Sequence, residues 1–195
     1  PWVRIPLSPP FFFIMFKGSI PALITPFDKG QVDYGSFNKI IEWSISEGSD
    51  GFVPCGTTGE SPTLSHGEHK KIVEECVRIV NKRVPVIAGT GSNNTIEAIE
   101  FTNHAENCGA DAALVVTPYY NKPTQEGLYA HFKKIADSTN LPIIIYNIPG
   151  RSVVDMSIDT MSKLSDLKNI IGVKDATNDL FRPVLSQTKI KKEFC

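Results

Sequence analysis

The 195-residue sequence has almost no excess charge, little cysteine and no long hydrophobic run. Its 20 basic side chains are matched by 21 acidic ones, and no basic block interrupts the middle of the chain. A balanced surface offers no electrostatic footprint for nucleic acid or an anionic membrane, so we expect neither as a partner. Small-molecule partners are favoured instead.

The four cysteines indicate neither a disulfide framework nor a zinc site. They are widely spaced, with no C-x-x-C pair and no nearby histidine cluster suited to zinc. We therefore expect free thiols, a cytoplasmic location and no metal. The cysteines are Cys55, Cys76, Cys108 and Cys195.

Both ends of the chain are irregular. The apolar burst from Phe11 to Phe16 is shorter than a signal-peptide core of roughly 7 to 15 residues or a membrane span of about 20. We interpret residues 1–14 as a disordered or artefactual extension, with Met15 as the natural start. Residues 15–180 are predicted to form one domain, and residues 181–195 a divergent tail without a recognisable element.

Short apolar runs repeat along the domain at a nearly constant step. Their central residues lie about 28 to 34 positions apart, the length of a strand followed by a helix. Each run suits a strand buried in a parallel sheet. The six runs are GSIPALIT, DGFVPCG, VPVIAGTG, AALVVTPYY, LPIIIYN and NIIGVKDA.

Helical patterns fill the gaps between these runs. In the second, Ser65 and Glu68 form a capping-box start, and Cys76 falls on the apolar face, which makes it a core residue. The predicted helices span residues 36–47, 65–81, 94–108, 124–139 and 157–165.

Six such steps fit a doubly wound open sheet or an incomplete (β/α)8 TIM barrel. Polar segments follow most strands, namely GTTGES, GTGSNN, TPYYNKP, YNIPGRS and KDATND. A barrel gathers such segments at one rim, whereas an open sheet concentrates binding at one switch point, so we predict the barrel. GTGSNN lacks the third glycine of a dinucleotide fingerprint, which disfavours a nucleotide site.

Lys174 stands at the end of an otherwise apolar run, NIIGVKDAT. If the sixth strand ends there, the side chain projects into the rim or upper interior of the barrel, where desolvation favours a neutral amine. A neutral amine attacks a ketone to form a Schiff base, which then yields an enamine nucleophile. A lysine at a strand end is more commonly a solvated edge residue, so the other rim residues decide between the two interpretations.

Several motifs together resemble the dihydrodipicolinate synthase family, within the class I pyruvate-dependent aldolases and lyases. They run in order from residue 15 to about 180: MFKGSIPALITPF, GTTGES, VIAGTG, VTPYYNKPTQEGLYAHF, YNIPGRS and IIGVKDAT. The resemblance implies a cofactor-free condensation of pyruvate with aspartate semialdehyde, on the route to diaminopimelate and lysine. It also implies a cytoplasmic homotetramer.

The resemblance assigns roles residue by residue. Lys174 matches the lysine that forms the pyruvate Schiff base, and Tyr146 matches the tyrosine that shuttles protons. A phenol is a poor base by itself, so it needs hydroxyl partners, which Thr57 and Tyr120 match. The family takes the latter tyrosine from a neighbouring subunit. Thr58 matches the residue that holds the pyruvate carboxylate.

Arg151 bears on which member of the family the chain resembles. A guanidinium binds a carboxylate through two hydrogen bonds, and aspartate semialdehyde carries one. The arginine in YNIPGRS stands where the synthases have it, whereas related sialic acid lyases lack it and usually have GSTGE in place of GTTGE. Sialic acid or keto-deoxy sugar acid lyases remain an alternative.

A second, regulatory site is also implied by the resemblance. Glu97 suits an ammonium group, and the imidazole and amide groups suit hydrogen bonds around it. The alternative is that the two histidines only face solvent on the first turns of their helix. The positions that match the lysine feedback site are His66, His69, Asn93, Glu97 and Tyr119.

Two readings outside this enzyme class stay open. The chain could be a non-catalytic remnant, or an unrelated phosphate-binding barrel. The second would need loops after strands 7 and 8. A (β/α)8 barrel takes about 250 residues, so we expect this form to lack those strands, to fold poorly and to show no turnover.

Overall fold

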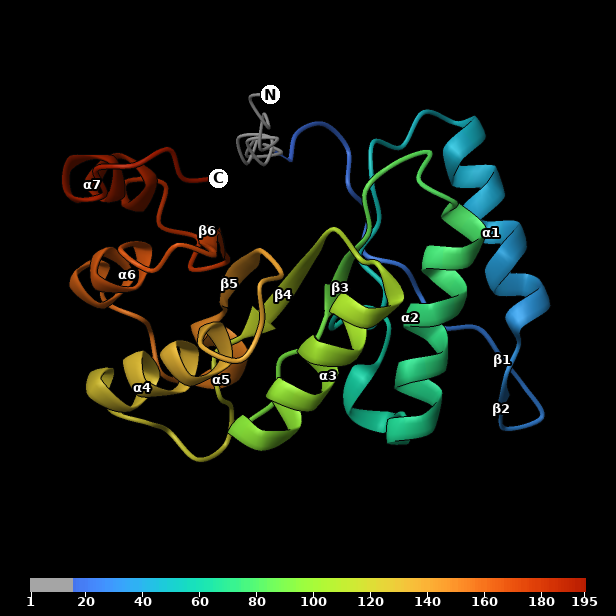
Figure 1. The fold of residues 1–195 in the computed structure, drawn as a ribbon, viewed down its shortest axis with the longest axis horizontal. Helices are drawn as coiled ribbons and strands as arrows, with labels where there is room; N and C mark the ends of the chain where they lie inside the picture. Colours follow the sequence, from blue (N-terminus) through green and yellow to red (C-terminus); the bar gives the residue numbers. More distant parts are fainter. Residues whose placement is uncertain (1–15) are drawn as a thin grey trace, which may run out of the picture.

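The computed structural model describes residues 16–195 (Figure 1). The interpretation of residues 1–14 as an extension, and of Met15 as the start, lies outside the described residues. Within residues 16–195, no helix has the length and apolar character needed to cross a membrane. The four cysteines are unpaired, as predicted.

A four-stranded parallel sheet forms the centre of the molecule. The strands lie side by side in chain order, as repeated βα units require. The first three strands are almost completely buried, which is typical of parallel strands covered on both faces. The strands are β3 (Ile87–Gly89), β4 (Ala112–Val116), β5 (Ile143–Asn147) and β6 (Ile170–Asp175).

The first two predicted strands are present only as single bridges. Ala22 pairs with Val53, and Phe52 with Val86, both in parallel. Each of the two runs contains a proline, Pro21 or Pro54, and a proline has no N–H to donate to a ladder. The prediction of full strands there was therefore wrong, although the chain follows the predicted path. The regular strands in this region are a short antiparallel hairpin, β1 (Phe27–Asp28) with β2 (Gln31–Val32).

The five predicted helices are confirmed to within a few residues. The capping box of Ser65 and Glu68 is formed, and Cys76 is fully buried. Figure 1 shows the helices following one another around the sheet, from α1 at one side to α6 at the other. The helices are α1 (Tyr34–Ser46), α2 (His66–Val80), α3 (Thr95–Cys108), α4 (Gln125–Ala136) and α6 (Ile158–Ser165).

Three short elements were not predicted. A 3-10 turn, Ser61–Thr63, follows the GTTGE segment, and α5 (Pro149–Ser152) follows β5. The helix α7 (Arg182–Lys189) lies in the segment expected to hold no element, so that prediction was wrong. After α7, the backbone of Cys195 hydrogen-bonds Ile171 and Val173 at 2.9 and 2.8 Å, along the free edge of β6. The polar sequence of this segment predicts neither α7 nor the pairing of Cys195 with β6, because both depend on contacts with distant parts of the chain.

Two apolar clusters lie on opposite faces of the sheet. The larger fills the space between sheet and helices and includes Phe132 and Ile143. The smaller includes Leu114, Ile144 and Tyr146 and lies on the face away from the helices. Alternate residues of β5 therefore enter alternate clusters, as the two-residue period of a strand requires.

An irregularity in β6 changes which face its last residues share. Ile143 pairs with Ile170, but Ile144 pairs with Gly172, so β6 contains one extra residue between these pairs. Regular alternation from Ile170, which faces the helices, would send Lys174 to the same side. The extra residue instead puts Lys174 in register with Tyr146, on the inner face.

Arg182 connects the ends of β5 and β6 on the helix side. The guanidinium donates to Asp175 at 2.9 Å, to Asp155 at 3.1 Å and to the carbonyl of Met156 at 2.8 Å. Asn147, at the end of β5, donates to Asp155 at 2.8 Å. Burial opposes ionisation of Asp175, but the hydrogen bonds from Thr177 and Arg182 outweigh it and lower the pKa of the carboxyl group.

Two buried histidines lie within the helical layer. The ring of His69 stacks on Phe101 with 4.0 Å between centroids, and neither ring nitrogen has a hydrogen-bond partner of normal geometry. His131 accepts or donates one hydrogen bond, at 2.9 Å from Thr95. Burial lowers the pKa of both imidazoles to about 4. At His69, the interaction with the Gly89 backbone raises the pKa and so offsets part of this effect. Both rings are therefore neutral in the folded protein near pH 7.

We expect Arg182→Ala to lower the free energy of unfolding by about 2 to 4 kcal/mol, because it removes a buried guanidinium and leaves the partly buried Asp175 carboxylate without its partner. Urea denaturation at pH 7 measures the change. Arg78→Ala is the matched control: the Arg78 side chain is largely exposed and Glu75 keeps Lys71 as a partner, so the loss should stay under about 1 kcal/mol. Equal losses in the two variants would contradict the role of Arg182.

We expect acid to destabilise the protein through His69 and His131. An unfolded imidazole takes up a proton near pH 6.5, whereas the folded ones do so only near pH 4. The stability that these rings contribute is therefore complete above about pH 6.5 and is lost as the pH falls towards 4. Each should contribute a drop of about 2 kcal/mol between pH 7 and pH 5. Urea denaturation of His69→Gln should show a drop smaller by that amount, and an unchanged drop would contradict the assignment.

Candidate active site

A cavity of about 240 Å³ lies at the carboxyl ends of the parallel strands. Three of the predicted catalytic and substrate-binding residues line it: Thr57, Tyr146 and Arg151. Tyr146 lies near the end of β5 and Arg151 in the short helix after it, whereas Thr57 follows the second apolar run. The polar residues therefore meet at one rim, as the barrel interpretation required.

Lys174 lies beside this cavity and faces Tyr146. The two residues are register partners on β6 and β5, and the lysine Nζ is 4.5 Å from the centroid of the tyrosine ring. The expectation that Lys174 would be desolvated was wrong, because its side chain is exposed. In the described residues, β6 has β5 on one side and only the end of the chain, at Cys195, on the other.

The GTTGE segment forms a tight turn at the mouth of the cavity. The Gly59 N–H donates to the carbonyl of Gly56 at 3.1 Å, and the buried Thr25 hydroxyl donates to the Gly59 carbonyl at 2.7 Å. Both threonines are exposed, but only Thr57 lines the cavity. At Gly89, a Cβ atom would approach the Cys55 carbonyl oxygen to 2.3 Å, so this close backbone contact needs glycine.

Arg151 is held by the short helix α5 directly after β5. Ser152 anchors this helix, because its hydroxyl is buried, accepts from Thr117 at 3.1 Å and donates to the Ile148 carbonyl at 3.0 Å. Sequence reasoning missed Thr117 and Ser152. Both residues lie in segments that follow strands, TPYYNKP and YNIPGRS, which could have drawn attention to them. Nothing in those segments distinguishes a residue that supports the site from an ordinary loop residue.

Cys55 also lines the cavity, yet it is unsuited to nucleophilic chemistry. Its side chain is buried, and burial raises the pKa of the thiol far above its usual range. Among the described residues that line or border the cavity, the chemistry is therefore confined to hydroxyl, guanidinium and amine groups.

Tyr119 and Tyr120 point to different surroundings. Tyr119 lines the cavity, whereas Tyr120 is 88% exposed and does not. Tyr120 also has a left-handed backbone, with φ of 71°, which is uncommon for an aromatic residue. The structure thus separates Tyr120 from Tyr146 and Thr57 within one chain.

Part of the predicted regulatory set forms a cluster at the start of α2 and α3. His66 Nε2 lies 2.5 Å from Glu97 Oε1, and the Ser92 hydroxyl also bonds the Glu97 carboxylate. His69 is buried behind this pair against Phe101, so it does not face solvent. Asn93 contributes its carbonyl to Asn121 at 3.0 Å.

The sequence matches the Dihydrodipicolinate synthetase family over residues 15–195. A curated relative, the 4-hydroxy-tetrahydrodipicolinate synthase of Rhodospirillum centenum, is 62% identical over 181 residues. That alignment covers 93% of this chain and 62% of the relative. The chain thus spans about three fifths of the length of the relatives it matches.

Solved structures give the same result. The dihydrodipicolinate synthase of Aquifex aeolicus superposes with a TM-score of 0.90 at 51% identity, over 92% of this chain and 61% of that one. A pyruvate complex of the chloride-inhibited enzyme of Acinetobacter baumannii gives 0.84 at 51% identity, over 89% and 62%. The lysine-bound enzyme of Cyanidioschyzon merolae gives 0.84 at 39% identity, over 88% and 60%.

These similarities extend over nearly all of the described residues and include both the strands and the rim. They confirm the predicted fold class, a (β/α)8 barrel that is incomplete in this chain. The family match covers residues 15–195, so it also includes the segment predicted to be divergent. By sequence and by structure, the chain belongs to the dihydrodipicolinate synthetase family.

Proposed function

We propose that the protein containing this chain condenses pyruvate with aspartate semialdehyde through a Schiff base on Lys174. One observation carries the proposal: Lys174 and Tyr146 lie side by side at the ends of adjacent strands, next to a cavity that Thr57 and Arg151 also line. The names of the relatives and the pyruvate complex of one of them support this reading.

In the proposed reaction, the Lys174 amine attacks the ketone carbon of pyruvate, and water leaves to give the imine. Loss of a methyl proton gives the enamine, whose carbon attacks the aldehyde of the second substrate. Tyr146 passes protons to and from these intermediates, with Thr57 as the next hydroxyl along the cavity wall. Thr58 is proposed to hold the pyruvate carboxylate from the same turn.

Arg151 is proposed to bind the carboxylate of aspartate semialdehyde. Arg151 lines the cavity, and its helix is anchored by the buried hydroxyl of Ser152. A guanidinium in that position disfavours the sialic acid and keto-deoxy sugar acid lyases, whose substrates present other groups.

The proposed quaternary structure is a cytoplasmic homotetramer. Tyr120 supports it, because an 88% exposed tyrosine outside its own cavity can reach the relay of a neighbouring subunit. The four unpaired cysteines suit a reducing compartment. Lysine is proposed as a feedback inhibitor at the cluster of His66 and Glu97, together with Asn93, the buried His69 and Tyr119 from the cavity wall. A solved relative carries bound lysine.

A second candidate, a non-catalytic form, is favoured by the exposure of Lys174. An exposed position lacks the apolar surroundings that Schiff-base lysines commonly have. The two candidates differ in whether pyruvate adds to this lysine.

Treatment of the natural protein with pyruvate and borohydride should leave one reduced adduct, on Lys174, because only an imine is reduced there. Mass spectrometry of peptides locates the adduct. Lys174→Ala should abolish it, whereas Lys122→Ala, in an exposed loop, should keep it. Trapping that persists in Lys174→Ala would sink the assignment, and no trapping in the unchanged protein would favour the non-catalytic form.

Arg151→Ala should raise the KM for aspartate semialdehyde by about 10-fold to 100-fold, because that is the loss of affinity expected when a charge-assisted hydrogen-bonded pair is removed. The KM for pyruvate should change far less. Steady-state kinetics with each substrate varied in turn measure both. Arg151→Lys keeps the charge without the planar fork and should recover only part of the loss. Similar increases for both substrates would remove the proposed role.

A further inference from the structure

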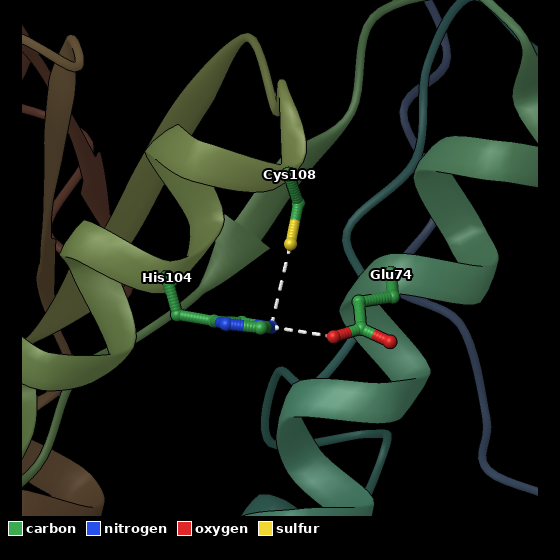
Figure 2. Close-up of side chains that lie close together, drawn as sticks. All are labelled: Glu74, His104 and Cys108. Atoms are coloured by element: carbon green, nitrogen blue, oxygen red, sulfur yellow. Dashed lines mark hydrogen bonds and ion pairs between the residues drawn. The ribbon is translucent and has the colours of Figure 1, made fainter.

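A second chemical cluster lies between α2 and α3 (Figure 2). Glu74 comes from α2, and His104 and Cys108 come from α3. The His104 Nε2 atom is 3.3 Å from the Cys108 sulfur and 3.5 Å from Glu74 Oε1. All three atoms lie within 4.8 Å of one another, and each residue is half-buried.

The packing of α2 against α3 brings these side chains together. His104 and Cys108 are four residues apart, so they lie on the same face of α3, one turn from each other. The stacked rings of His69 and Phe101 lie between the same two helices and fix their separation. The cluster is therefore held by the core rather than by flexible loops.

The separations match those of ligands around one zinc ion. Zinc binds sulfur at about 2.3 Å and nitrogen or oxygen at about 2.0 to 2.2 Å, which puts tetrahedral ligand atoms about 3.4 to 3.6 Å apart. The two contacts of His104 have almost these lengths. A rotation of the half-exposed Glu74 side chain can adjust the third separation.

We propose that Glu74, His104 and Cys108 bind a divalent cation of the zinc class, with the fourth position open to water. Thiolate, imidazole and carboxylate together suit zinc better than magnesium or calcium, which prefer oxygen ligands. The proposal replaces the expectation of no metal, which rested on spacing along the sequence. That spacing could not reveal a ligand from a second helix.

The charges around the cluster leave the required atoms available. Lys71 lies 3.4 Å from Oε2 of Glu74, the other carboxylate oxygen, and it is closer to Glu75, at 2.9 Å. Burial and the nearby Glu74 carboxylate raise the pKa of the Cys108 thiol, so it is not an activated nucleophile by itself. Metal binding would form the sulfur–metal bond and release the thiol proton to solvent.

A simpler interpretation is a helix-to-helix hydrogen bond. His104 Nε2 is 3.2 Å from the backbone carbonyl of Lys70, to which it can donate. That contact stabilises the packing of α2 and α3 without any ligand, so the test must measure metal binding itself.

The test uses Co²⁺ as a spectroscopic probe of the reduced protein, followed by displacement with Zn²⁺. One equivalent of Co²⁺ should produce a thiolate-to-cobalt absorption band, and Zn²⁺ should remove it. Because loss of even an outer partner of a ligand weakens metal binding about 10-fold to 100-fold, Cys108→Ser and His104→Gln should weaken it by at least 100-fold. Glu74→Gln should weaken it by about 10-fold or more.

Matched controls separate this site from other thiols and carboxylates. Cys195→Ser removes an exposed thiol, and Glu75→Gln changes the neighbouring carboxylate on α2, so both should keep the band and the affinity. Zn²⁺ should also raise the thermal unfolding midpoint of the unchanged protein and of Glu75→Gln, but not of His104→Gln. Absence of the band, or unchanged affinity in Cys108→Ser, would establish that the cluster is only an interhelical contact.

Discussion

The candidate chemistry depends on one buried arginine that connects two strand ends. Arg182 binds Asp175 directly, and it reaches Asn147 through Asp155. Asn147 directly follows Tyr146, and Asp175 directly follows Lys174. Tyr146 and Lys174 are the two residues proposed to act on pyruvate. Because neighbouring residues in a strand face opposite sides, fixing Asn147 and Asp175 on the helix side fixes Tyr146 and Lys174 on the inner side. The pairing of β5 with β6 sets the spacing of Tyr146 and Lys174, and the Arg182 guanidinium supports it from the helix side.

The position of Lys174 also requires an irregular strand. The extra residue in β6 turns its last residues by one position relative to regular alternation. Without it, the lysine would face the helical core, where an unpaired ammonium group is costly. The same shift brings Gly172 against the end of the chain, where a Cβ atom would approach the Cys195 carbonyl oxygen to 2.5 Å. The irregular geometry of β6 is therefore what places the Lys174 side chain on the inner face.

The α2 and α3 seam connects two clusters of different chemistry. At one end, His66 pairs with Glu97 near the rim, and further along, His104 lies between Glu74 and Cys108. The buried His69 lies on the same seam, and burial lowers the pKa of its imidazole to about 4. The proposed cation site and the candidate lysine site therefore share one pair of packed helices.

The sequence alone determined the order of the βα units, the helix starts and the identity of the rim residues. Periodicity and capping are local properties, so Ser65 with Glu68 and the apolar runs were sufficient to predict them. The motifs likewise identified Lys174, Tyr146, Thr57 and Arg151 without any coordinates.

Only the tertiary structure decided which of these groups meet, and how. It put Thr57, Tyr146 and Arg151 on one cavity, left Lys174 exposed beside it, and separated Tyr120 from all of them. It also joined Glu74 to His104 and Cys108. The physical reason is that strand register, helix packing and burial arise from contacts between residues distant in the sequence, and no local pattern encodes those contacts.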